Sequence, residues 1–276
     1  MPHALLNDVD LQPTRRWNMS MFGLGHELGR GKFARVHVAR TKCPSMSTLA
    51  LKVLCKSELD QNVEEQVQCE IKTHKNLVHP NIICLYGSFD DKVRICLVLE
   101  LAPKGTLFDR VLEWHRVPEQ MSSQYIAQLT DALEYLHGKH IIYCNIDLEN
   151  ILVDVHGRVK LADFSYSTQT RNHQTTICGT TAYLAPEMVE NQPYLEKVDH
   201  WALGVLTYQL LTGKSPFTGR NPPIHTYRWI MEVDLWIPNH VSLDASNLIQ
   251  RLLCKNPEDR LTLSEVKNHR WISRYQ

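Results

Sequence analysis

The pattern of hydrophobic residues changes once along the chain, and this change constrains the fold more than any other feature. Residues 102–105 (Ala-Pro-Lys-Gly) form a cluster of structure-breaking residues. Before them, short apolar or β-branched runs bounded by turns predict strands. After them, apolar residues recur every three or four positions, which predicts helices. We therefore expect an α+β fold with a small β-rich half, a larger α-helical half and a ligand crevice between them.

In the first half, one helix interrupts the strands, because Val63, Val67 and Ile71 recur every four residues and lie on one face. This half is expected to begin at residue 22, after a loose extension over residues 1–21. The predicted strands share β-branched or apolar residues and cover residues 34–39, 49–54, 82–88 and 95–99.

In the second half, helices are expected over residues 122–137 and over the almost entirely apolar residues 198–211. Asp244 and Thr262 are predicted N-caps of two more helices, and Glu265 completes the spacing of a capping box with Thr262. The predicted boundaries are 22–101 for the first half, 102–271 for the second and 272–276 for a short tail.

Composition narrows the class of protein. The 276 residues include 43% hydrophobic and 22% charged side chains, enough for a large core. Lys and Arg number 30, as do Asp and Glu, so composition gives no reason to expect nucleic acid or an anionic membrane as partner. The eight cysteines include no C-x-x-C pair, and no stretch resembles a signal peptide or membrane span, which favours an intracellular protein with reduced thiols.

A glycine-rich segment lies between two strand-like runs. Gly29 and Gly31 would let backbone N–H groups approach phosphates closely, although such segments are also common hairpin turns. Ala34 occupies the third position, where a stricter motif has glycine.

Lys52 is the single charged residue in the apolar run 49–53. It is either an outward-facing strand lysine or an ammonium that binds phosphates. A buried ammonium needs an anion, and Glu70 on the predicted helix is the candidate partner.

Three further motifs follow in order. Residues 143–150 (Tyr-Cys-Asn-Ile-Asp-Leu-Glu-Asn) precede an apolar strand, residues 163–165 are Asp-Phe-Ser, and residues 185–187 are Ala-Pro-Glu. With the glycine-rich segment, Lys52 and Glu70, this series resembles the signature of protein kinases from Phe22 to Trp271. The resemblance implies the bilobal kinase fold, with one regulatory helix in the small lobe.

Within the kinases, the chain is most similar to the Aurora Ser/Thr kinases. The segments that carry this similarity are residues 28–33, 49–54, 79–82, 100–103, 175–180 and 196–199. The resemblance implies ATP and Mg²⁺ as cofactors, with Asn150 and Asp163 as metal ligands. The remaining residues that it places at the nucleotide are Gly29, Gly31, Ala34, Val36, Ala50, Lys52, Leu99, Glu100, Ala102, Glu149 and Leu152.

Two residues depart from the catalytic loop of an active kinase. Asn145 stands where the family has the Asp that accepts the substrate proton, and a positioned base is worth about 10²–10⁴-fold in rate. Asp147 replaces a lysine that contacts the transferring phosphoryl group, so repulsion takes the place of charge stabilisation. Efficient transfer is therefore not expected.

Other departures concern activation and substrate choice. Cys144 replaces the arginine that would hold a phosphate on the activation loop. Thr176 matches the Aurora phosphorylation position and Thr175 precedes it, but His173 and Gln174 replace the expected arginines. Elsewhere, Ser165 replaces a glycine, Gln209 stands where many basophilic kinases have Glu, and Glu149 keeps one acidic contact for a basic substrate.

Three hypotheses remain open. The first is an Aurora-like pseudokinase that binds Mg-ATP and acts as a scaffold or regulator. The second is an active Ser/Thr kinase in which Asp147 serves as the base, and the third is a nucleotide-free interaction module. The resemblance implies a protein substrate or protein partner, an activator peptide on the small lobe, and a location in the cytoplasm or nucleus, at the spindle, centrosome or centromere.

Overall fold

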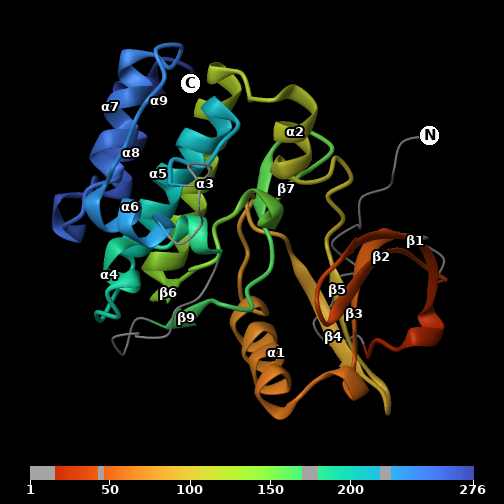
Figure 1. Ribbon diagram of the computed structural model, residues 1–276. Helices are drawn as coiled ribbons and strands as arrows, with labels where there is room; N and C mark the ends of the chain where they lie inside the picture. The colour runs from red at the N-terminus through yellow and green to blue at the C-terminus, as the bar shows by residue number, and fades with distance from the viewer. Residues whose placement is uncertain (1–15, 43–46, 170–179, 218–224) are drawn as a thin grey trace. The chain divides into compact units, whose positions relative to one another are not determined.

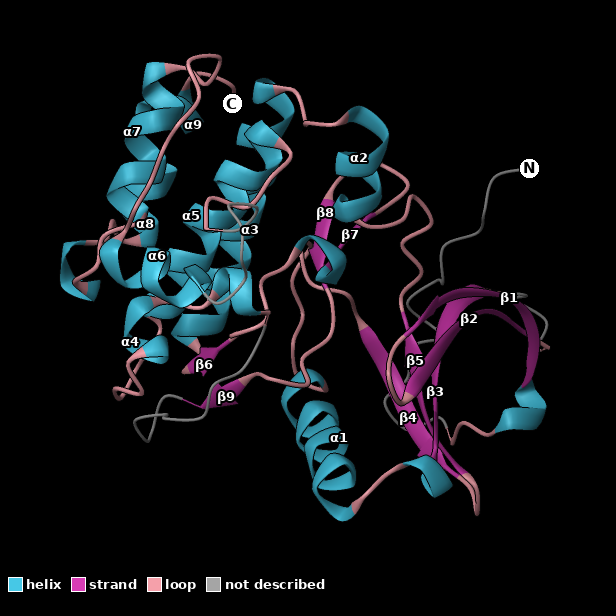
Figure 2. Ribbon diagram, viewed as in Figure 1, coloured by secondary structure: helices cyan, strands magenta, loops and turns pink. Residues whose placement is uncertain are grey.

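The computed structural model describes residues 16–42, 47–169, 180–217 and 225–276. The chain divides into two compact units, Met1–Pro103 and Lys104–Gln276, so the division falls inside the predicted breaker cluster. Strands dominate the first unit and helices the second (Figure 2). The predicted α+β, bilobal kinase fold is confirmed.

The first unit is built on one antiparallel sheet with the strand order β1-β2-β3-β5-β4 (Figure 1). The helix α1 (Gln61–His74) follows β3 and begins at Asp60, whose carboxylate accepts a hydrogen bond from the N–H of Val63. The strands are β1 (Phe22–Arg30), β2 (Ala34–Thr41), β3 (Thr48–Cys55), β4 (Leu85–Asp90) and β5 (Arg94–Leu99).

Alternation along the strands gives this sheet two apolar faces. On one face, Leu49 and Leu51 of β3 pack in a cluster with Trp17 and Phe22, whose rings stack at 5.4 Å. On the other face, a second cluster includes Leu54 of β3, Leu97 of β5 and Val67 of α1. Trp17 lies within the predicted loose extension, yet it is only 8% exposed, so the packed core begins before residue 22.

The second unit is organised around two long helices, α3 (Glu119–Gly138) and α5 (Lys197–Thr212), which contact each other. Both fall where apolar periodicity predicts helices, and α5 is buried on nearly all sides. The other helices are α2 (Leu107–Trp114), α4 (Pro186–Val189), α6 (Thr226–Glu232), α7 (Leu243–Leu252), α8 (Leu263–Lys267) and α9 (Arg270–Ser273). The short strands are β6 (Ile141–Ile142), β7 (Ile151–Val153), β8 (Val159–Leu161) and β9 (Thr168–Gln169).

One of the two predicted N-caps is correct. Thr262 and Glu265 form the expected capping box at the start of α8. The prediction for Asp244 is wrong, because the hydroxyl of Ser242 caps α7 and Asp244 lies in its first turn. A short hydroxyl residue two positions earlier satisfies the first N–H groups equally well.

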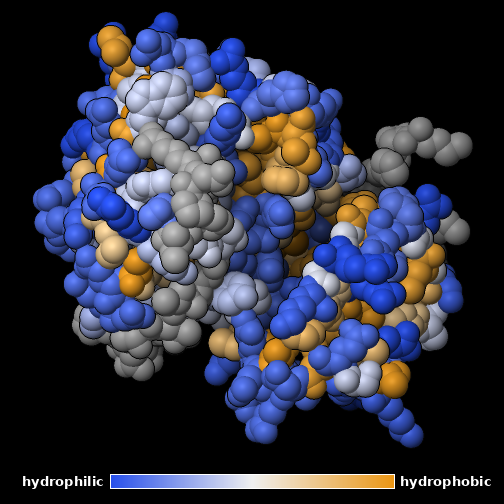
Figure 3. Space-filling model, in the orientation of Figure 1, coloured by the Kyte–Doolittle hydropathy of each residue, from blue (hydrophilic) through white to orange (hydrophobic). Residues whose placement is uncertain are grey.

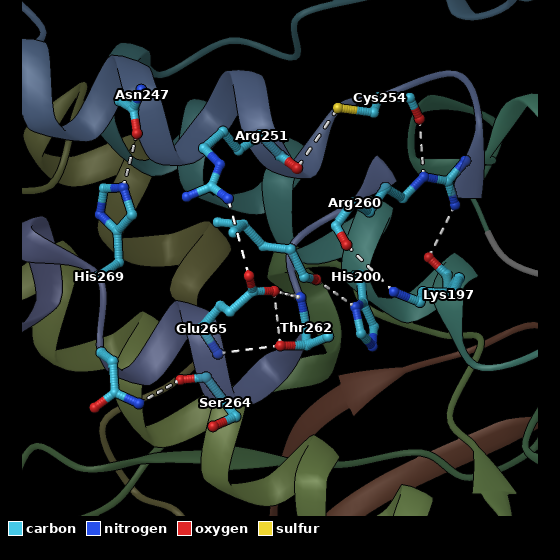
Figure 4. Close-up of polar contacts among 12 residues, drawn as sticks. Lys197, His200, Asn247, Arg251, Cys254, Arg260, Thr262, Ser264, Glu265 and His269 are labelled. Atoms are coloured by element: carbon cyan, nitrogen blue, oxygen red, sulfur yellow. Dashed lines mark hydrogen bonds and ion pairs between the residues drawn. The ribbon is translucent and has the colours of Figure 1, made fainter. Parts of the chain in front are cut away.

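Arg260 ties several loops of the second unit together. Its guanidinium forms two hydrogen bonds of 2.7 Å with the carboxylate of Glu187, and both side chains are buried. It also donates to the carbonyl oxygens of Cys254 and Lys197, each at 2.9 Å (Figure 4). The planar guanidinium, with its five N–H donors, thereby fixes the start of α5 to these neighbouring segments.

No helix in the described part of the chain is long and apolar enough to cross a membrane.

Candidate functional site

Lys52 and Glu70 form an ion pair in the first unit. The Nζ of Lys52 lies 2.8 Å from one carboxylate oxygen of Glu70 and 3.2 Å from the other. Their side chains are 14% and 3% exposed, so the pair is largely shielded from water. The strand β3 supplies the ammonium and the helix α1 supplies the carboxylate, as the sequence suggests. The pair fixes the ammonium of Lys52 beside the carboxylate of Glu70.

The glycine-rich segment joins β1 and β2 as a hairpin. The N–H of Gly31 donates to the carbonyl oxygen of Ala34 at 2.8 Å, and Gly29 pairs with Val36 across the strands. A Cβ added at Gly29 would meet nothing within 4 Å, and one added at Gly31 would come no closer than 3.8 Å to Ala34. The fold therefore has room for a side chain at both positions.

Among the apolar residues predicted at the nucleotide, Val36, Ala50 and Leu99 lie on neighbouring strands of one sheet, whereas Leu152 belongs to β7 of the second unit. Ala50 of β3 pairs with Leu99 of β5, and Val36 of β2 pairs with Lys52. Glu100 follows β5 and is fixed to Cys84, because its N–H donates to the Cys84 carbonyl oxygen at 2.9 Å. Ala102 follows and is half-buried.

In the second unit, Asp199 holds the backbone of the catalytic loop. It is fully buried, and its carboxylate accepts hydrogen bonds from the N–H groups of Tyr143 and Cys144, each at 2.9 Å. His137 contacts the same carboxylate at 2.8 Å. Three partners satisfy a charge that would otherwise be strongly destabilising in an apolar helix.

Asn145 points its amide into this loop rather than toward water. It is 4% exposed, and its Nδ2 donates to the carbonyl oxygen of Asp163 at 3.2 Å. The backbone carbonyl oxygen of Asn145 accepts from the Nδ2 of Asn150 at 3.1 Å, which leaves the Oδ1 of Asn150 as the atom suited to a cation. Three of the predicted site residues, Asn145, Asn150 and Asp163, are therefore joined by hydrogen bonds.

A short 3₁₀ turn, Leu148–Asn150, follows in the same loop. Glu149 lies on this turn and Asp147 directly precedes it. Asp147 caps this turn, since its Oδ1 accepts from the N–H of Glu149 at 3.2 Å. Nearby, the hydroxyl of Tyr183 donates to the amide oxygen of Gln209 at 2.5 Å. Burial, together with the negative charges of Asp147 and Glu149, holds the pKa of Tyr183 well above its usual value.

Two residues next to the site take the left-handed backbone conformation. Asp163 has φ of 56° and Cys144 has φ of 60°, whereas Ser165 is not among the described residues with positive φ. The serine at position 165 is therefore compatible with this backbone without the strain that a side chain meets at positive φ.

Sequence reasoning identified the motif residues but missed how the loop is supported. The hydroxyl of Tyr143 donates to the carbonyl oxygen of Ala162, and its ring packs edge-on against Phe164 at 5.3 Å. The anchoring role of Asp199 was also missed, although a lone carboxylate in an apolar helix is a signal that it needs buried partners. Thr175 and Thr176, the predicted regulatory residues, lie outside the described residues, as do His173 and Gln174.

Comparisons with known proteins agree with this arrangement. The family model for the protein kinase domain matches residues 22–272. The chain is 47% identical to an Aurora kinase of Schizosaccharomyces pombe over 95% of its length and 74% of that protein. It is 43% identical to the Serine/threonine-protein kinase Aurora-1 of Arabidopsis thaliana over 94% of its length and 88% of that protein. It is also 44% identical to Aurora kinase A-B of Xenopus laevis, of which it spans 63%.

The chain therefore belongs to the protein kinase family, and within that family its similarity is to the Aurora Ser/Thr kinases.

Proposed function

We propose that this Aurora-like domain binds Mg-ATP, transfers phosphoryl groups poorly and acts as a regulator or scaffold. One observation supports this most strongly: the side chain at the position of the proton acceptor is an amide that donates to the carbonyl oxygen of Asp163. An amide nitrogen engaged as a donor cannot accept a proton from a substrate hydroxyl.

Nucleotide binding is proposed because the candidate ligands are present and suited to it. Lys52 is held by Glu70 for contact with phosphate oxygens, and Asn150 and Asp163 offer amide and carboxylate oxygens. Such hard oxygen ligands suit Mg²⁺, which would neutralise phosphate charge when bound.

Impaired transfer follows from two changes that act on the same step. Loss of the base is worth about 10²–10⁴-fold, and Asp147 adds a negative charge where charge develops. Typical kinase turnover is about 1–100 s⁻¹. Loss of the base alone would therefore reduce turnover to roughly 10⁻⁴–1 s⁻¹.

A thermal-shift titration tests nucleotide binding. Mg-ATP at 100 times its Kd should add about 2.7 kcal/mol to the free energy of unfolding, and Lys52→Met should reduce that shift. No shift at millimolar Mg-ATP would favour the nucleotide-free interaction module. Single-turnover transfer from labelled ATP then tests catalysis, and turnover at ordinary kinase rates that Lys52→Met abolishes would reject the pseudokinase proposal.

A second candidate function is an active kinase in which Asp147 is the base. The observation that favours it is that Asp147 is a half-buried carboxylate on the same loop, with Oδ1 accepting a hydrogen bond from the backbone N–H of Glu149. In this case Asp147→Asn should abolish transfer, while Asn145→Ala should change it little. Equal rates in both variants and the unaltered chain would reject it.

Protein partners are proposed from family membership. The expected partner is a protein substrate or a regulated protein, with an activator peptide on the first unit, and a role in cell division at the spindle, centrosome or centromere. Imaging of the tagged chain through division, with an exclusively interphase distribution as the contrary result, tests the cellular part of this proposal.

A further inference from the structure

A cavity of about 450 Å³ lies in the second unit, formed by residues that the kinase motifs do not include. Its lining comes from the end of α2, the link between α2 and α3, the last turn of α5 and the loop before α7. Binding pockets for small molecules have volumes of roughly 300–1,000 Å³ and are mainly apolar with a few fixed polar groups. The cavity is therefore large enough for one small organic molecule.

The lining is apolar apart from three side chains. Trp114, Pro118 and Leu211 are among its apolar residues. The guanidinium of Arg110 lies over one face of the Trp114 ring at 5.2 Å, so a ligand ring would stack on the other face. The polar residues are Arg116, Glu119 and His240. The ligand that fits this lining has an aromatic ring and charged groups at its edge.

Two of the polar side chains are held in position. The carboxylate oxygen Oε1 of Glu119 accepts from the indole N–H of Trp271 at 2.8 Å and also from the hydroxyl of Ser242. The Nε2 of His240 donates to the carbonyl oxygen of Leu211 at 3.2 Å. Fixed groups of this kind reduce the entropy lost when a ligand binds.

Arg116 and Glu119 carry opposite charges in the same lining, but no ion pair joins them in the described part of the chain. Arg116 is exposed, whereas Glu119 is half-buried and directed to Trp271. A cavity with separated positive and negative groups is complementary to a ligand with the reverse arrangement. A purely anionic ligand would be repelled by Glu119, and a purely cationic ligand would be repelled by Arg116.

We propose that this cavity binds a small aromatic zwitterion, with its carboxylate at Arg116, its ammonium at Glu119 and its ring against Trp114. This binding is separate from the proposed nucleotide function and does not depend on it.

Isothermal titration calorimetry with the full chain and three probes tests the proposal. L-Tryptophan carries both charges, tryptamine lacks the carboxylate and indole-3-propionate lacks the ammonium. L-Tryptophan is expected to bind with a Kd on the order of 1 mM, as its size implies. Each analogue should bind about tenfold more weakly or worse, the usual effect of losing a charged hydrogen bond.

Two variants assign the charges to their partners. Arg116→Gln should weaken L-tryptophan binding to the level of tryptamine without changing tryptamine itself. Glu119→Gln keeps an acceptor oxygen for Trp271 and Ser242, and should weaken L-tryptophan to the level of indole-3-propionate. Arg228→Gln, at an exposed arginine on α6, is the matched control and should leave binding unchanged.

Thermal melts of the same samples confirm that each variant is folded. The proposal is overturned if folded protein shows no binding of L-tryptophan at 10 times the expected Kd. It is also overturned if the two analogues bind as tightly as L-tryptophan, or if Arg228→Gln weakens binding as much as Arg116→Gln.

Discussion

Asn145 differs from the carboxylate it replaces by its ability to donate a hydrogen bond. Its Nδ2 donates to the carbonyl oxygen of Asp163, and this hydrogen bond connects the loop to a candidate metal ligand. A carboxylate at this position would face that carbonyl oxygen as a second acceptor. Replacing Asn145 with Asp therefore removes the hydrogen bond to Asp163 and introduces a carboxylate that can act as a base.

We predict that Asn145→Asp combined with Asp147→Lys raises single-turnover transfer to a basic peptide by about 100-fold or more, because the variant restores both a base and a stabilising cation. The same variant should unfold at lower denaturant, since the bond to Asp163 is lost. Adding Lys52→Met serves as the control and should remove the gain. An unchanged rate in a folded double variant would contradict the proposed cause of impaired transfer.

The ion pair between Arg260 and Glu187 should be strongly coupled to stability. Arg260→Met leaves a carboxylate buried without its partner, and this is expected to lower the free energy of unfolding by about 3–5 kcal/mol. Lys267→Met is the matched control, because Lys267 is 39% exposed and such surface pairs contribute about 0–1 kcal/mol. Urea unfolding of both variants measures the difference, and similar losses would contradict the prediction.

At the scale of elements, α5 packs so closely that its single glycine, Gly204, has no room for a side chain. A Cβ at Gly204 would lie 2.8 Å from the Cβ of Leu252 and 2.9 Å from a methyl group of Leu253. We expect Gly204→Ala to destabilise the protein by about 1–3 kcal/mol through overpacking. Denaturant unfolding provides the measurement.

Gly138, the last residue of α3, is the matched control. A Cβ there would meet nothing within 4 Å, and its φ is not among the positive values. Because alanine favours helix over glycine by about 1 kcal/mol in a helix interior, Gly138→Ala should leave stability unchanged or raise it. A loss as large as that of Gly204→Ala would contradict the packing argument.

Local sequence patterns predicted one helix cap and the Lys52–Glu70 pair, but they did not predict the tertiary contacts that support the loops and the sheet. The capping box at Thr262 and Glu265 depends on adjacent residues, so spacing alone identified it. The pairing of Lys52 with Glu70 also followed from sequence, because a buried ammonium requires an anion. The contacts of Asp199 with Tyr143 and of Trp17 with Phe22 depend on tertiary packing, which periodicity does not report.

At the scale of the whole molecule, acid should weaken the fold through His200. This residue is 4% exposed, and its Nδ1 donates to the carbonyl oxygen of Leu261 at 2.8 Å. Burial, with smaller contributions from the neighbouring His137 and Lys197, lowers the pKa of His200 from 6.5 to about 4.

The sign of the pH dependence follows from this lowered pKa. Above pH 6.5 neither state holds the proton, so the contribution of His200 is complete. As pH falls toward 4, the unfolded chain binds a proton that the folded chain does not. The free energy of unfolding should therefore fall by up to about 3 kcal/mol over this window.

Urea unfolding across this pH range measures the effect. His200→Gln keeps a donor for Leu261 but cannot titrate, so its profile should be flatter than that of the unaltered chain, whatever its stability at neutral pH. Parallel profiles would show that other groups cause the pH dependence.

Asp199 has a consequence for how such a protein can evolve. It binds the N–H groups of residues 143 and 144, which every amino acid except proline supplies, and makes no demand on their side chains. This contact therefore survives side-chain changes at these two positions, although the ring and hydroxyl of Tyr143 are held separately by Phe164 and Ala162. Because one nucleotide change interconverts Asp and Asn codons, a single mutation can exchange these residues at position 145 while the backbone anchor at Asp199 stays in place.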